Sequence, residues 1–275
     1  MDTILKHFGL YNCNPVTYHL DKNHQIDKAT TINKVITNAG NTNSEVNVKL
    51  YQQMVRSLMY TVIGTRPNIA FMVTRLSQFL TKPTKKHFDT IKHVFQYLKG
   101  IRDIKLSFPY SQQQQQQPNA SNALILEGFT DSDFAGCPNT HHSTSGYIFK
   151  LANYAISWRS RKEKSVATSI PKAEYMAQAF AAKHYLWLLC GLQEFGYDIT
   201  HSLSMDNTAS YNLVHNPRIG DKSKHIQVAF HFTRELVENG TIIVLRTSSK
   251  ENLVDICTKT IISSVFLVLR HLIIN

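Results

Sequence analysis

The chain has 275 residues, 43% hydrophobic and 18% charged, which suits a globular protein long enough to bury a core. Its four cysteines are widely spaced and form no CxxC pair, which disfavours a zinc site or a disulfide framework. The net charge is +11, and residues 1–110 hold 15 Lys and Arg against 6 Asp and Glu. This basic half favours a polyanion such as nucleic acid as partner, with a merely basic soluble surface as the alternative.

The first 110 residues are predicted to be mainly helical. Residues 1–45 are polar and irregular, without the apolar run that is typical of a signal peptide. Apolar side chains then recur at helical spacing over 48–64, 69–80 and 85–100, and proline-containing turns separate these segments. No catalytic constellation occurs here. The Gln-rich segment 111–123 that follows is a predicted linker.

The second half predicts an α/β domain with a mixed sheet, because short strands joined by turns give way to alternating helices and strands. Strands are expected at 124–134, 144–153, 154–165, 201–207 and 241–249, with a tight turn near Ala152–Asn153. Helices are expected at 172–196, 207–215 and 225–240 and from residue 252. The apolar segment 261–274 is too short to span a bilayer and predicts a packed terminal helix.

Four carboxylates of this half are candidates for metal-assisted phosphodiester cleavage, which needs converging oxygen ligands. They are Asp131 in the first strand, Glu174 in the first turn of the long helix, Asp206 at the end of the fourth strand and Asp255 at the last helix start. Each has a structural alternative. Glu174 would favour the helix dipole, Asp206 would serve as an N-cap, and Asp255 would simply be solvated.

The order of several motifs between Gly128 and Lys259 resembles one known family. The motifs are "TDSD", "STSGY", "ISW", "AEY", "DN", "KHI" and "DICTK". Together they resemble the ribonuclease H domain of Copia-type (Pseudoviridae) LTR-retrotransposon Pol polyproteins. The upstream segments "NPVTYHL" and "YQQMVRSLMYTVIG" are similar to the region between polymerase core and ribonuclease H in those polyproteins. The paired-aspartate motif of the polymerase is absent, so the chain resembles a C-terminal fragment from which polymerase activity is not expected.

The resemblance implies a fold and a division into domains. The fold would be α/β, with a ribonuclease H-like mixed five-stranded sheet flanked by helices over 124–262. A small helical reverse-transcriptase connection region would precede it over 1–110, and a C-terminal helix or tail would occupy 263–275.

The resemblance also implies a reaction, namely hydrolysis of the RNA strand of RNA/DNA hybrids during reverse transcription. Asp131, Glu174, Asp206 and Asp255 would be the catalytic residues and would bind two Mg²⁺ ions, for which Mn²⁺ could substitute. The implied partners are the RNA/DNA hybrid and the upstream polymerase core, with no membrane. The implied location is the cytoplasm, in virus-like particles, with the nucleus as a further site.

Five further residues are candidates for substrate binding, each with a structural alternative. Arg159 and Arg161 would hold phosphates or form an exposed strand face, and Lys224 and His225 would contact substrate or start a helix. Asn207 would touch substrate or orient Asp206. For Asp133, which shares a strand face with Asp131, a solvated position is favoured over an accessory charge at the metal site.

Two departures from the family pattern leave a second function open. Pro171 and Lys172 stand where Thr and Glu are common, and Lys172 would add positive charge near Glu174. The alternative is therefore a catalytically silent nucleic-acid-binding remnant of a Pol polyprotein. An integrase is disfavoured, because the "AEY" helix lies between the first and the later aspartates.

Overall fold

The computed structural model describes residues 1–18, 47–108, 123–215, 224–249 and 251–274, and the side chains of residues 224–230 are not described. The predicted linker 111–123 thus lies, apart from its last residue, outside the described residues.

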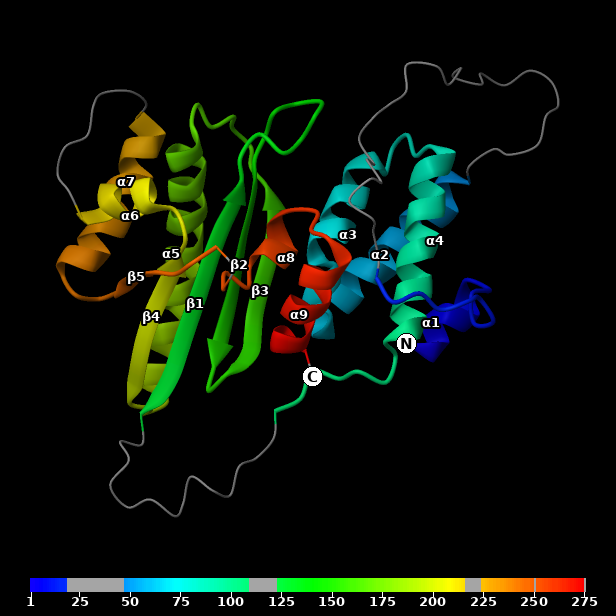
Figure 1. Ribbon diagram of the computed structural model, residues 1–275, viewed down its shortest axis with the longest axis horizontal. Coiled ribbons are helices and arrows are strands. Elements are labelled where there is room, and N and C mark those ends of the chain that lie inside the picture. The colour runs from blue at the N-terminus through cyan, green and yellow to red at the C-terminus, as the bar shows by residue number, and fades with distance from the viewer. Residues whose placement is uncertain (19–46, 109–122, 216–223, 250, 275) are drawn as a thin grey trace, which may run out of the picture.

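A five-stranded mixed sheet forms the centre of the molecule, in the order β3-β2-β1-β4-β5 (Figure 1). The strands are β1 (Leu124–Asp133), β2 (Thr144–Leu151), β3 (Tyr154–Lys162), β4 (Ile199–Met205) and β5 (Val244–Arg246). Strand β1 pairs antiparallel with β2, and β2 with β3, whereas the β1–β4 and β4–β5 pairs are parallel. The predicted mixed five-stranded sheet is confirmed, although β5 is shorter than the expected segment 241–249.

The β2–β3 connection confirms the predicted tight turn. Its two central residues, Ala152 and Asn153, have positive φ angles of 49° and 72°. Two consecutive positive φ angles are typical of the hairpin turn whose twist matches that of the flanking strands.

Helices cover both faces of the sheet (Figure 1). One face packs against α5 (Ile170–Glu194), α6 (Thr208–His215) and α7 (Lys224–Glu238). On the other side lie α8 (Asp255–Thr258), α9 (Ser263–Ile273), α2 (Val48–Thr65), α3 (Ala70–Leu76) and α4 (Lys85–Gly100), with the short 3₁₀ helices η1 (Pro67–Ile69) and η2 (Ser77–Phe79). The described part of the chain contains no helix with the length and apolarity that crossing a membrane requires.

Two terminal helices complete the fold. The terminal helix α9 was predicted. Helix α1 (Asp2–His7) was not, because the segment is polar apart from a few residues, of which Leu5 is buried in the core.

The helical N-terminal region and the sheet share one hydrophobic core. A single cluster of buried residues includes Leu58 and Phe95 from the helices, Ile148 from β2, and Val254 and Phe266 near the C-terminus. The indole Nε1 of Trp158 in β3 also donates a hydrogen bond to the Val62 carbonyl (2.8 Å). The predicted boundary after residue 110 therefore divides segments that bury apolar surface together, and the domain division itself stays a prediction.

A buried tyrosine of α5, Tyr185, contacts the backbones of two neighbouring strands. The Tyr185 hydroxyl lies 2.7 Å from the Leu126 carbonyl of β1 and 2.9 Å from the Ser202 carbonyl of β4. We expect Tyr185→Phe to lower the free energy of unfolding by about 1–2 kcal/mol, because the buried carbonyls lose their shared donor. Urea unfolding monitored by circular dichroism measures this loss. The matched control is Tyr197→Phe, since the Tyr197 side chain is largely exposed, and an equal loss there would contradict the explanation.

Candidate active site

Three carboxylates converge where β1 and β4 separate. The parallel pairing of these strands ends at Phe129 and Ser204, so Asp131 lies on β1 beyond the last pair and Asp206 directly follows β4. Helix α5 brings Glu174 to the same place, and one carboxylate oxygen of each of Asp131, Glu174 and Asp206 lies within 4.8 Å of the others. Ligand sites commonly form at the carboxyl ends of parallel strands, where the chain leaves the sheet in different directions.

The carboxylate triad of Asp131, Glu174 and Asp206 concentrates negative charge at a buried position. Asp131 is 2% exposed and Glu174 is 6% exposed. Burial, followed by repulsion from Asp131 and Asp206, raises the pKa of Glu174 to about 9. Burial likewise raises the pKa of Asp131. Buried carboxylates so close together are stable only with a proton or a cation between them, so an all-oxygen donor set of this kind fits a hard divalent ion.

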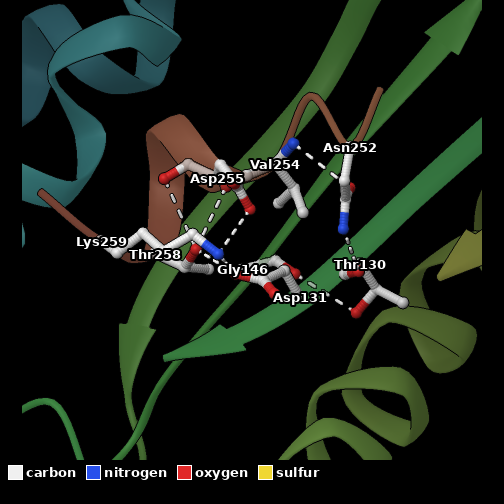
Figure 2. A network of polar contacts seen from close by, with 8 residues as sticks. All are labelled: Thr130, Asp131, Gly146, Asn252, Val254, Asp255, Thr258 and Lys259. Atoms are coloured by element: carbon white, nitrogen blue, oxygen red, sulfur yellow. Dashed lines mark hydrogen bonds and ion pairs between the residues drawn. The ribbon is translucent and has the colours of Figure 1, made fainter. Parts of the chain in front are cut away.

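Asp255 joins the site through Lys259 (Figure 2). The Lys259 Nζ lies 2.8 Å from Asp255 Oδ1 and 3.7 Å from Asp131 Oδ2. Burial raises the pKa of Asp255 to about 6. For Lys259, burial favours the neutral amine, but the carboxylates, Asp131 foremost, outweigh it and raise the pKa. The fourth predicted acid therefore lies beside the triad and shares a cation with it.

Two further side chains near the C-terminus position Asp131 and its strand (Figure 2). The Thr258 hydroxyl donates a hydrogen bond to Asp131 Oδ2, and Asn252 Nδ2 donates to the Thr130 carbonyl (3.2 Å). Helix α8 packs directly on β2, because a Cβ added at Gly146 would lie 2.7 Å from Thr258 Cγ2. Sequence reasoning assigned no role to Asn252, Thr258 or Lys259. The spacing of Asp255 and Lys259 was the available signal, since residues four apart are neighbours on a helix.

The structure corrects two alternatives for the predicted acids. Helix α5 begins at Ile170, so its first turn holds no acidic residue and Glu174 does not serve the helix dipole there. The N-cap alternative for Asp206 is also wrong, because Asn207 performs that role: its Oδ1 accepts a hydrogen bond from the Ser210 backbone N–H (2.9 Å) at the start of α6.

The favoured solvated position for Asp133 is wrong as well. This side chain is half-buried and packs so closely on Gly136 that an added Cβ would lie 1.7 Å from Asp133 Oδ2. Burial and the neighbouring Asp131 carboxylate raise its pKa. Asp133 therefore contributes to the negative potential of the site.

The predicted substrate-binding residues occupy different places. The guanidinium carbons of Arg159 and Arg161 lie 5.4 Å and 4.9 Å from the centre of the Phe180 ring in α5. Lys224 and His225 start α7, but their side chains lie outside the described residues.

Helix α5 accommodates both departures from the family pattern. Pro171 lies in its first turn, where proline is well tolerated. The Lys172 Nζ donates to Thr168 Oγ1 (2.9 Å).

No protein-family profile matches the chain. It is 31% identical over 274 residues, or 99% of its length, to the retrovirus-related Pol polyprotein from transposon TNT 1-94 of Nicotiana tabacum. It is 34% identical over 76% of its length to the corresponding polyprotein from transposon RE2 of Arabidopsis thaliana. The chain spans only 19% and 14% of the length of these two relatives. Among solved structures, LC11-RNase H1 in complex with an RNA/DNA hybrid superposes loosely, with a TM-score of 0.34, 14% identity and coverage of 47% of this chain and 88% of that one.

Proposed function

This chain is homologous to part of the retrovirus-related Pol polyproteins of Copia-type plant transposons, and from this premise we propose that it hydrolyses the RNA strand of RNA/DNA hybrids. The observation that carries the proposal is the convergence of Asp131, Glu174 and Asp206. Asp255 and Lys259 lie beside them. A buried cluster of acids without enough cations to balance it is costly to the fold, which supports a functional role over a structural one.

The acids of the site would hold the Mg²⁺ ions. Asp131, Glu174 and Asp206 each place one oxygen within 4.8 Å of the others, and Mg²⁺ prefers oxygen ligands. When bound, these ions supply an acidic water molecule and neutralise charge on the reacting phosphate. Thr258 holds Asp131 in place by its hydrogen bond, while Lys259 pairs with Asp255 and favours its ionised form. The chain's own contribution is thus a rigid, preorganised set of carboxylates on strand and helix ends.

Recognition of the hybrid would depend on backbone shape and charge. The 2′-hydroxyls in the wide minor groove of an A-form-like hybrid identify the RNA strand. The excess of Lys and Arg in residues 1–110 supports binding of such a polyanion. Contacts of this kind carry little base information, so we expect low sequence specificity.

A hybrid labelled on either strand tests this proposal directly. We expect the purified chain with Mg²⁺ to cut the labelled RNA strand and to leave the DNA strand intact. The variant Asp206→Asn should not cut either strand. Binding of the hybrid without cleavage in either Mg²⁺ or Mn²⁺ would instead identify the chain as a silent nucleic-acid-binding remnant.

A further inference from the structure

A groove of about 670 Å³ runs along the outer edge of β3, where the sheet faces α2, α3 and η2. Because β3 is an edge strand, one side of its backbone has no neighbouring strand. The Thr74 hydroxyl of α3 donates to the Ser160 carbonyl on that side (3.2 Å). The groove therefore borders the helical region and the edge strand β3, and the proposed reaction at the carboxylate triad does not use it.

The lining of the groove is basic. Its 15 residues include Arg159, Arg161 and Lys162 and contain no Asp or Glu. Within the described parts of the chain, none of these three cations forms an ion pair with a carboxylate. A concave surface lined by charges of one sign attracts a ligand of the opposite sign.

The side chains of Arg159 and Arg161 both pack against the aromatic ring of Phe180. Both guanidinium groups lie over Phe180 of α5, on the face of β3 opposite to α2 and α3, so the groove extends around the edge of the strand. A cation–π contact uses the face of the guanidinium. Arg159 also shares a hydrogen bond with Tyr147, and the remaining N–H donors of the two guanidinium groups stay available at the edge. These planar donors match the geometry of phosphate oxygens, so the pair is preorganised for a phosphate-bearing ligand.

Further donors in the groove lack partners. The Lys162 Nζ donates to Gln78 Oε1 (3.0 Å), which leaves the amide Nε2 of Gln78 buried without a hydrogen-bond partner. The Ser160 hydroxyl is also buried without a partner. Buried polar groups are normally satisfied, and both residues line the groove.

We propose that this groove binds the sugar–phosphate backbone of one nucleic-acid strand, outside the catalytic centre. The inference rests on the proposed function for the identity of the polyanion. The groove would be a second contact region for the substrate, formed jointly by β3 and the helical region. This region would fix how a long substrate lies across the molecule.

The test measures binding at several salt concentrations in the full chain carrying Asp206→Asn, so that the substrate is not consumed. Two ligands are compared, a blunt RNA/DNA hybrid and the same hybrid with a single-stranded DNA extension. We expect Arg159→Ala combined with Arg161→Ala to reduce the slope of log affinity against log salt by roughly 2, since each phosphate contact contributes about 0.9. Affinity should fall about tenfold or more. The control Arg102→Ala removes an exposed cation paired with Asp103 and should change neither quantity.

The pattern of loss locates the bound strand. Loss with both ligands places the duplex backbone in the groove, whereas loss only with the extended ligand places a single strand there.

Gln78→Glu is a second variant that keeps the Lys162 contact and adds a negative charge, and it should also weaken binding. Unchanged affinity and slope in both variants would overturn the proposal. Cleavage by the wild-type chain is measured separately. If the wild type does not cleave the hybrid but the arginine variant still shows the reduced salt slope, the proposed function is refuted and the groove assignment stands.

Discussion

Replacing Glu174 by Gln is expected to abolish hybrid cleavage and, in metal-free buffer, to stabilise the protein. Loss of one proposed ligand carboxylate should lower the rate of the proposed cleavage by about 10³-fold or more, since metal-assisted charge stabilisation contributes several kcal/mol. The same change removes a buried acid that Asp131 and Asp206 repel. Folding at neutral pH requires protonation of this acid, which costs free energy that a neutral amide does not cost, so we expect a gain of about 1–4 kcal/mol. Thermal unfolding with and without Mg²⁺ measures this gain.

The stabilisation should depend on pH. The pKa of Glu174 rises from 4.5 to about 9 on folding, so the folded chain retains a proton that the unfolded chain releases. Metal-free wild type should therefore lose stability as the pH rises from about 4.5 toward 9, and the Gln variant should lose less. Glu194→Gln makes the same chemical change at an exposed position of the same helix and should alter neither cleavage nor stability. A variant that loses cleavage but gains no metal-free stability would show that the triad is not under electrostatic strain.

Phe266→Ala is expected to lower the free energy of unfolding by about 3–5 kcal/mol, the usual cost of truncating a buried phenylalanine. Phe266 of α9 is 2% exposed. Its ring packs edge-on against Tyr97 of α4, with ring centres 5.7 Å apart. It belongs to the cluster that also contains Ile148 of the sheet and Leu58 of α2. A single cavity would therefore weaken the packing of the helical region and of the sheet at once.

The form of the unfolding curve tests the division into domains. Because the regions share a core, we expect one cooperative transition that shifts as a whole in Phe266→Ala. Val268→Ala in the same helix removes an exposed side chain and should change stability by less than about 0.5 kcal/mol. Two separate transitions, of which only one shifts in Phe266→Ala, would show instead that residues 1–110 and the sheet unfold as independent domains.

Local patterns predicted much of this molecule before any contact was known. The stripe of apolar residues in 85–100 corresponds to α4, which ends at Gly100 as expected. The β2–β3 hairpin follows from two short alternating segments around Ala152 and Asn153. Such features depend on residues a few positions apart. Where the local signal was weak, the prediction failed, as at α1, where burial of Leu5 by distant parts of the chain stabilises a short helix.

The sequence by itself determined the order of the elements from α2 onward, the family likeness and the identity of the four candidate acids. Only the tertiary structure decided that Asp131, Glu174 and Asp206 meet, while Asp255 lies beside them with Lys259. It also decided that Asn207 caps α6 in place of Asp206. The physical reason is that helical and strand periodicity arises within one segment, whereas side-chain convergence depends on strand pairing, helix packing and burial between segments far apart in the chain.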